Sequence, residues 1–338
     1  MASFRDPPRL PIIDLALFEL GEPWRDHVAA QVDWAASEFG FFYVVGHGVE
    51  MGTIDSLLDL SRSFFRMEEG IKQRIHMSRG GRAWRGYFPV GGEVTSGRPD
   101  LKEGLYFGEE LPEDDSRVRA GMPLHGRNLF PDLPGFRGAV MDYMTALSGL
   151  GHKLMSSIGR GLRVGDNYFV DRYTGLPTQL FRIFNYPAET DGRFDDSYGV
   201  GEHTDYGLLT LLYQDEVGGL QVKYADGWLD VPHVPGSFVI NVGDMLERLT
   251  AGRYTSALHR VINPSQQPRI SMPFFFDPSF DAVLHPIPGL GPRQLADVRR
   301  DRWDGLDLSE VEGTYGDYLL GKVSKVFPDL GRYYLQAS

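Results

Sequence analysis

The hydrophobic pattern of this chain changes its period near residue 178, and this change limits the folds that the chain can adopt. Before that point, apolar residues recur at helical spacing over 22–39, 54–65 and 134–163. After it, short apolar runs lie between turn residues and predict strands over 180–186, 208–214, 220–224, 238–242, 259–262 and 270–276. Short strands at such intervals are typical of a sandwich or a jelly roll. The pattern therefore predicts an α+β fold in which helices, mostly N-terminal ones, flank a β core.

The same pattern divides the chain into four regions, 1–133, 134–177, 178–285 and 286–338. The first contains helices and short strands, but its part from 79 to 133 is rich in Gly, Pro and charge and is expected to be mostly loop. The second is a helical connection whose glycines favour a kink or a break. The third is a sandwich or jelly-roll core and the fourth a helical or lid region. We expect the four regions to form one integrated unit.

Composition excludes several classes of protein. The chain has 338 residues and no cysteine, which excludes disulfides, cysteine nucleophiles, iron–sulfur clusters and thiolate zinc sites. Any metal site must use nitrogen and oxygen ligands. The net charge of -12 argues against nucleic acid or an anionic membrane as the main partner.

The N-terminal segment carries charges and prolines rather than the apolar run of a signal peptide. No stretch approaches the roughly 20 apolar residues of a membrane span. We expect a soluble cytoplasmic protein without a membrane partner, as a monomer or a weak homo-oligomer.

Two histidines and one aspartate have the residue types of a metal site. If His203 and Asp205 lie on one extended stretch, their side chains point to the same side. His259, at the start of a predicted strand, is a third candidate. Two imidazoles and one carboxylate are typical of non-haem Fe(II) sites that keep positions open for other ligands. Taken singly, His203 and Asp205 are also compatible with an exposed loop pair, and His259 with a half-buried strand histidine.

A possible anion site follows on the last predicted strand. Arg269 and Ser271 are two residues apart, so both face the same side of that strand. A guanidinium can bind a carboxylate with two parallel hydrogen bonds, and a hydroxyl can add a third. The pair therefore favours a site for a dicarboxylate inside a barrel. The alternative is a surface arginine at a strand edge.

Taken in order, these residues resemble the isopenicillin N synthase-like branch of the Fe(II)/2-oxoglutarate-dependent dioxygenases. The resemblance covers nearly the whole chain and includes the segments 10–15, 39–49, 218–222 and 235–244. It implies a double-stranded β-helix, which is a jelly roll. It also implies iron on His203, Asp205 and His259, and 2-oxoglutarate on Arg269, Ser271 and Tyr186.

A loop in the N-terminal region resembles one in the bacterial ethylene-forming enzyme, a member of the same family. Glu93 and Thr95 match residues that contact an arginine substrate there, and Tyr206 matches as well. Arg182 and Phe276 are expected to point toward the same cavity. A carboxylate at Glu93 predicts a substrate with a cationic or hydrogen-bond-donating group. The alternative is a shared loop scaffold in which Glu93 points to solvent.

The resemblance implies an oxidoreductase that converts 2-oxoglutarate and O2 to succinate and CO2 and hydroxylates a small molecule, in secondary metabolism. One alternative within the family is an oxidative cyclase that works without 2-oxoglutarate, as isopenicillin N synthase does. Another is a jelly roll that only binds a small acid, and a third is action on a protein side chain.

Overall fold

Two β-sheets form the core of the computed structural model, which describes residues 9–95, 97–188, 199–262, 267–290, 305 and 307–327. The small sheet has the order β11 (Gly227–Asp230), β10 (Leu220–Tyr224), β13 (His259–Val261) and β8 (Val200–His203). The large sheet has the order β1 (Ile12–Asp14), β2 (Phe41–Val45), β12 (Phe238–Val242), β9 (Leu209–Gln214), β14 (Arg269–Ser279), β7 (Pro177–Tyr186), β6 (Glu103–Gly108) and β3 (Gly86–Phe88). The predicted α+β jelly roll is confirmed.

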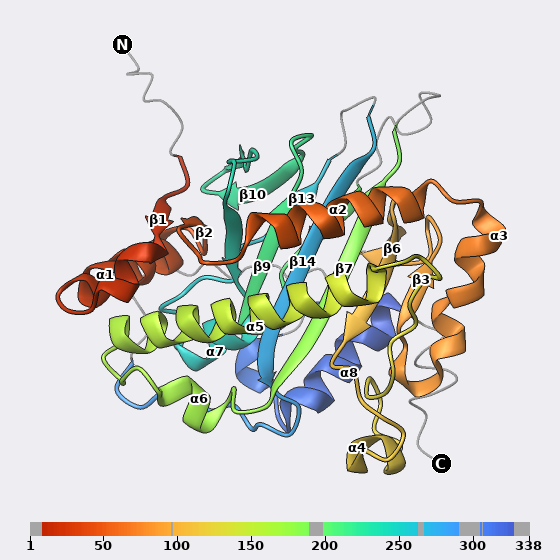
Figure 1. Ribbon diagram of the computed structural model, residues 1–338. Helices are drawn as coiled ribbons and strands as arrows, with labels where there is room; N and C mark the ends of the chain where they lie inside the picture. The colour runs from red at the N-terminus through yellow and green to blue at the C-terminus, as the bar shows by residue number, and fades with distance from the viewer. Residues whose placement is uncertain are drawn as a thin grey trace.

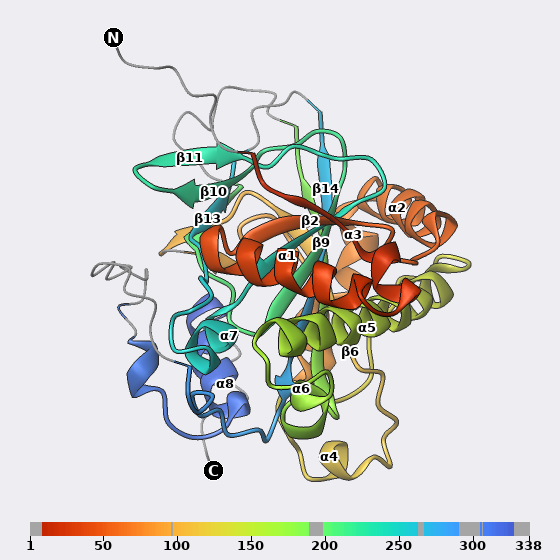
Figure 2. The same ribbon diagram turned by 90° about the vertical axis from the view of Figure 1, so that its left-hand side faces the viewer.

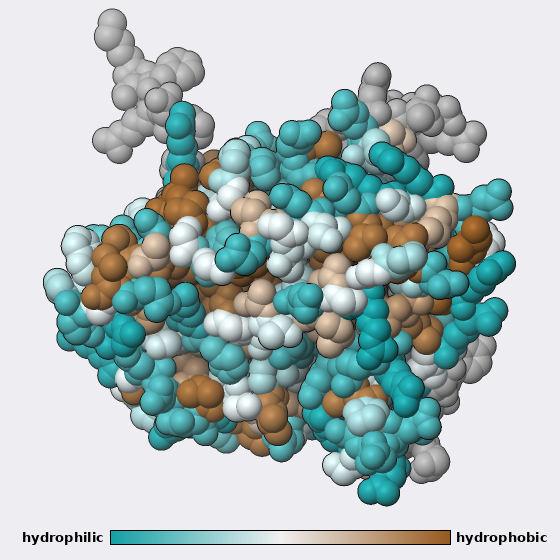
Figure 3. Space-filling model, viewed as in Figure 1, coloured by the Kyte–Doolittle hydropathy of each residue, from teal (hydrophilic) through white to brown (hydrophobic). Residues whose placement is uncertain are grey.

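Helices cover the two sides of the large sheet (Figures 1 and 2). α2 (Met51–Phe65) and α5 (Phe136–Gly161) lie on one side, and α1 (Trp24–Glu38) packs against α5. α7 (Asp244–Leu249) and α8 (Tyr315–Val326) lie on the other. On the outward surface that includes α2 and α5, hydrophobic residues are scattered among hydrophilic ones, as expected for amphipathic helices with a buried inner face (Figure 3).

The remaining elements are short. They comprise the hairpin of β4 (Val94–Thr95) and β5 (Arg98–Pro99), the helices α3 (Glu69–Lys72), α4 (Ser116–Arg119) and α6 (Tyr168–Arg172), and the 3-10 helices η1 (Leu15–Leu20), η2 (Gln73–Ile75), η3 (Met77–Ala83) and η4 (Leu308–Glu310). Within the described residues, no helix has both the length and the hydrophobicity needed to cross a membrane.

α5 is one continuous helix, so the predicted kink or break is absent. Its glycines allow close packing instead. A Cβ at Gly151 would lie 2.5 Å from the ring of Phe276 on β14, and one at Gly159 would lie 2.4 Å from the carbonyl oxygen of Gly165. Each glycine within a helix costs about 1 kcal/mol relative to alanine. At Gly151 this cost accompanies the close packing of α5 on β14.

Several strands were missing from the sequence prediction. β6 and β3 lie within 79–133, which was expected to be mostly loop, and β6 pairs with β7 in the large sheet. β8, whose last residue is His203, was also missed. Glycines interrupt the apolar alternation in β6 and β8, and this removes the usual strand signal. In the predicted C-terminal region, α8 is present, whereas residues 291–304, 306 and 328–338 lie outside the described residues.

Candidate active site

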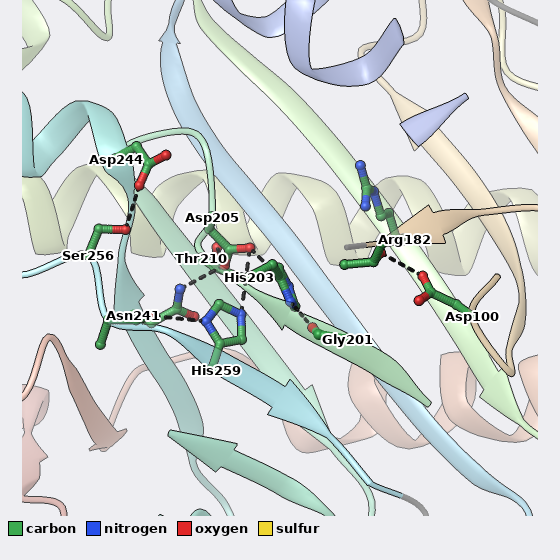
Figure 4. A network of polar contacts seen from close by, with 12 residues as sticks. Asp100, Arg182, Gly201, His203, Asp205, Thr210, Asn241, Asp244, Ser256 and His259 are labelled. Atoms are coloured by element: carbon green, nitrogen blue, oxygen red, sulfur yellow. Dashed lines mark hydrogen bonds and ion pairs between the residues drawn. The ribbon is translucent and has the colours of Figure 1, made fainter. Parts of the chain in front are cut away.

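Strand pairing brings the two candidate histidines together. His203 ends β8, His259 begins β13, and the two residues are direct partners in the antiparallel register. Their ring centroids lie 4.2 Å apart. Asp205 follows two residues after β8, and its side chain turns toward both rings (Figure 4). Residues that are far apart in sequence therefore meet because one register aligns them.

The backbone fixes which ring nitrogen of each histidine faces the third side chain. His203 Nδ1 lies 2.8 Å from the Gly201 carbonyl oxygen, and His259 Nδ1 lies 3.1 Å from that of Ala257. Because Nδ1–H donates to a carbonyl in this arrangement, Nε2 keeps its lone pair. The two Nε2 atoms lie 3.8 and 3.7 Å from Asp205 Oδ1. Burial and the neighbouring His259 lower the pKa of His203 to about 3, so His203 is neutral, as a metal ligand must be.

The carboxylate of Asp205 is held from its far side. Its Oδ2 accepts hydrogen bonds from Thr210 Oγ1 and, at 2.7 Å, from Asn241 Nδ2. Burial favours the neutral acid, but attraction to His259 and His203 together with these hydrogen bonds lowers the pKa of Asp205 overall. The carboxylate is thus ionised, with Oδ1 aimed at the two imidazoles. These three side chains, which we call the metal triad, place one ligand atom each within 4.8 Å of one another and could hold one ion.

Alternation along β14 decides which of its side chains reach the interior. Arg269, Ser271, Pro273, Phe275 and Asp277 all line the cavity between the sheets. Phe276 lies on the opposite face, where its ring packs against Gly151 and His152 of α5. The expectation that Phe276 points into the cavity is therefore wrong by one position, and Phe275 is the aromatic residue that lines it.

Arg269 has the surroundings of an anion-binding residue. It is 1% exposed, its guanidinium carbon lies 4.7 Å from the centroid of the Tyr186 ring, and its Nη2 donates to Gln214 Oε1 at 3.0 Å. Among the described residues, its Nε and Nη1 have no hydrogen-bond partner. Buried unpaired donors on a charged group are costly, so this edge of the guanidinium fits a carboxylate from outside the chain. Ser271 and Tyr186 line the same cavity.

The cavity contains about 880 Å³ of non-atom space, including its opening to solvent. The metal triad and Arg269 line it together with Glu93, Thr95, Arg182 and Tyr206. Of the residues predicted for substrate contact, the structure therefore brings four to this cavity and leaves Phe276 outside it.

Glu93 does not point to solvent but belongs to a buried set of four charged side chains, which we call the charge cluster: Glu93, Asp100, Lys102 and Arg182. Lys102 Nζ lies 2.8 Å from Glu93 Oε2 and also contacts Asp100 Oδ2. Arg182 Nη1 donates to Glu93 Oε1 at 3.2 Å, and Tyr106 Oη donates to the same oxygen at 2.7 Å. Burial alone would raise the pKa of Glu93, but Lys102 and Arg182 lower it to about 2. The carboxylate is ionised and already paired.

Sequence reasoning missed Asp100, Lys102 and Asp277 around these groups. Asp100 accepts a hydrogen bond at 2.7 Å from Thr95, a predicted residue whose hydroxyl therefore bonds to the charge cluster. Asp277 is a further buried carboxyl group beside Gly207, and it accepts a hydrogen bond from Tyr315 Oη of α8. Burial raises the pKa of Asp277 to about 7. For Asp277, spacing from Arg269 on the same strand was a usable signal; for Lys102 and Asp100, no signal linked them to Glu93.

Comparison with known proteins agrees with this geometry. Residues 10–133 match the family described as the N-terminal region of non-haem dioxygenases in morphine synthesis, and residues 177–278 match the 2OG-Fe(II) oxygenase superfamily. The chain belongs to the 2OG-Fe(II) oxygenase superfamily. It is an Fe(II)/2-oxoglutarate-dependent dioxygenase, an oxidoreductase with iron and 2-oxoglutarate as its cofactor and cosubstrate.

Three relatives illustrate the similarity. A protein of Dictyostelium discoideum described as a probable iron/ascorbate oxidoreductase is 45% identical, over 95% of this chain and 96% of its own. A 1-aminocyclopropane-1-carboxylate oxidase of Dictyostelium mucoroides is 36% identical, over 96% of both. The crystal structure of a full-length Neurospora crassa protein in complex with α-ketoglutarate (2-oxoglutarate) and 5-formyluracil superposes with a TM-score of 0.78 at 26% identity, covering 95% of this chain and 98% of that one.

These comparisons bear on the alternatives raised by the sequence. The homologues are 2OG-Fe(II) oxygenases that hydroxylate or oxidise small molecules, and an oxidative cyclase that works without 2-oxoglutarate is not favoured. The donor set also fits the cofactor, because two imidazole nitrogens and an ionised carboxylate suit non-haem iron. The unpaired edge of Arg269 likewise fits the cosubstrate.

Proposed function

We propose that His203, Asp205 and His259 hold the iron and that Arg269, Ser271 and Tyr186 bind the distal carboxylate of 2-oxoglutarate. The observation that carries this assignment is the convergence of two Nε2 atoms and one carboxylate oxygen beside an arginine with two unpaired buried donors. When bound, iron with 2-oxoglutarate supplies oxidation of a carbon–hydrogen bond by dioxygen.

The chain's own side chains orient and shield this chemistry. Gly201 and Ala257 hold the imidazoles through their carbonyls, while Thr210 and Asn241 hold the carboxylate of Asp205. Such outer contacts fix ligand orientation and typically change metal affinity about 10- to 100-fold. Apolar walls from Leu212 and neighbouring residues keep water from the reacting centre.

The reaction that this site supports best is hydroxylation of a small molecule, with 2-oxoglutarate and O2 converted to succinate and CO2. A cavity enclosed between two sheets and bordered by α8 suits a small molecule better than a folded protein. We place the enzyme in cytoplasmic secondary metabolism, as a monomer or weak homo-oligomer acting without nucleic acid or membrane. The four sequence regions would act as one catalytic unit.

The test is release of succinate from 2-oxoglutarate under Fe(II) and O2, with amino acids and secondary metabolites screened for stimulation. Loss of a direct ligand should exceed the effect of an outer contact, so Asp205→Ala should lower turnover by more than ~100-fold and release iron. Asp226→Ala, on the exposed β10–β11 turn, is the control and should behave as the wild type. Near-normal turnover in Asp205→Ala would refute the metal assignment.

A further inference from the structure

Arg182 has one buried hydrogen-bond donor, its Nε, that no described residue accepts from. Its Nη1 donates to Glu93, but its Nε is buried and has no hydrogen-bond partner among the described residues. The side chain is 13% exposed and lines the cavity. Leaving such a donor unpaired is unfavourable unless something else completes it.

Aromatic rings fix the guanidinium in this position. Its central carbon lies 4.2 Å from the centroid of the Tyr106 ring and 4.8 Å from that of Phe275. Stacking of this kind leaves the edge of the guanidinium plane as the direction in which it can still bind. The group is therefore preorganised for a planar acceptor.

The carboxylates of the charge cluster are engaged. Glu93 accepts from Tyr106 and Arg182 and pairs with Lys102, while Asp100 accepts from Lys102 and Thr95. A cationic substrate group would have to displace one of these buried donors. Arg182, by contrast, lines the cavity with a donor that no described residue pairs, so an anionic group would not have to displace a partner of that donor.

Arg182 lies apart from the predicted cosubstrate anchor. Arg269 pairs with Tyr186 in the register of β14 and β7, and Arg182 precedes Tyr186 by four residues on β7. At about 3.4 Å per residue, Arg182 and Tyr186 are about 14 Å apart along the strand. Figure 4 shows Arg182 across β14 from the metal triad. Because of this separation, Arg182 is available to bind the carboxylate of a second acid besides 2-oxoglutarate. The same cavity has apolar walls formed by Leu180, Phe275, Leu319 and Val326.

We infer that the substrate is a small carboxylic acid with an apolar body, and that Arg182 binds its carboxylate through the Nε edge. This inference rests on the proposed function and replaces the cationic substrate that Glu93 predicted from sequence. It makes Arg182 a specificity-determining residue rather than a member of a purely structural cluster.

The experiment measures binding, not turnover. A panel of linear and phenyl-substituted acids of three to ten carbons, each with its primary amide, is titrated by anaerobic calorimetry into protein loaded with Fe(II) and 2-oxoglutarate. At least one acid should bind about tenfold or more tightly than its amide, as expected for a charge-assisted hydrogen bond. Arg182→Met should reduce that ratio to near one, and Arg182→Lys should give an intermediate ratio. If no acid is preferred over its amide, the inference is wrong.

Two further variants sharpen the result. Glu93→Gln removes a carboxylate that competes for Arg182, so preference for the acid should persist or increase. Tight binding of L-arginine to the wild type that is lost in Glu93→Gln would restore the cationic substrate and overturn the inference. Arg137→Met is the matched control, because Arg137 also contacts a carboxylate and an aromatic ring, Glu110 and Phe130, but is largely exposed outside the cavity.

Loss of 2-oxoglutarate affinity in Arg182→Met, with the acid-to-amide ratio unchanged, would assign Arg182 to the cosubstrate and also overturn the inference. Thermal melting of each variant shows whether it folds, and Arg182→Lys keeps the test open if Arg182→Met does not. Succinate release by the wild type reports separately on the proposed function.

Discussion

The metal triad and the charge cluster lie in one cavity but are completed in different ways. In the metal triad, Gly201, Ala257, Thr210 and Asn241 hold the outer atoms, and the inner atoms, two imidazole nitrogens and one carboxylate oxygen, face one another. In the charge cluster, two cations and two carboxylates face one another and form ion pairs, and of the buried donors of the two cations only the Nε of Arg182 has no acceptor among the described residues. The difference teaches that burial alone does not mark a ligand site. What marks it is a set of buried polar atoms that the chain orients but does not pair.

The largest effect is expected at Arg269, whose unpaired donors, like the atoms of the metal triad, are completed by a ligand from outside the chain. Arg269→Ala removes the only charged partner proposed for the distal carboxylate of 2-oxoglutarate, and loss of one partner of a buried charge pair costs about 3–5 kcal/mol. The 2-oxoglutarate requirement, measured as KM, should rise at least ~100-fold. Ser271→Ala removes a single hydrogen bond worth about 1 kcal/mol, and so should raise it less than ~10-fold. Equal and small effects would show a different mode of binding.

The charge cluster, in contrast, should matter for stability in the absence of any ligand. Lys102→Met leaves Glu93 and Asp100 buried without their shared cation, so the free energy of unfolding should fall by about 3–5 kcal/mol. Lys153→Met breaks a far more exposed pair with Glu19 and should cost less than about 1 kcal/mol. Urea denaturation of the metal-free proteins measures both. Similar losses in the two variants would mean that the charge cluster is not a self-completed unit.

Asp277 represents a third case, a buried carboxyl group whose hydrogen-bond partner is the neutral hydroxyl of Tyr315. Its pKa is raised to about 7 by burial, so between about pH 4 and 7 the unfolded chain loses a proton that the folded chain keeps. The contribution of Asp277 to the stability of the metal-free protein should therefore fall as pH rises through this window and then level off, by about 2–4 kcal/mol in total. His203, whose pKa is lowered to about 3, contributes the opposite slope below about pH 6.5, so the Asp277 part is read from the difference between the wild type and the variant. Asp277→Asn should lack this contribution, as unfolding at several pH values would show. An unchanged slope in Asp277→Asn would place the titration elsewhere.

Sequence reasoning succeeded where one strand or one register carries the information. The six strands predicted after residue 178 are all present, and spacing of two correctly placed Arg269 and Ser271 on one face of β14. The same spacing, continued from Arg269, reaches Phe275 rather than Phe276. The run of three phenylalanines at 274–276 shows no alternation of its own, and this is why the wrong ring was chosen.

Sequence reasoning failed where the two members of an ion pair or a packing contact come from separate helices, strands or loops. Glu93 follows β3 closely in sequence, but its partners Lys102 and Arg182 lie just before β6 and on β7. Nothing in the local pattern indicates that their charges cancel. The glycines of α5 were similarly read as helix breakers, because their actual role depends on Phe276 and Gly165 of other elements.

The pairing of His203 with His259 has a consequence for how the small sheet is assembled. β8 is an edge strand of four residues, and its partner β13 has three, so few hydrogen bonds fix their alignment. A shift of one residue would turn an imidazole to the opposite face. Only the native alignment offers an ion all three ligands. Binding of that ion would thus favour one alignment among those open to two short strands, so the side chains needed for catalysis would also stabilise the register at this edge of the small sheet.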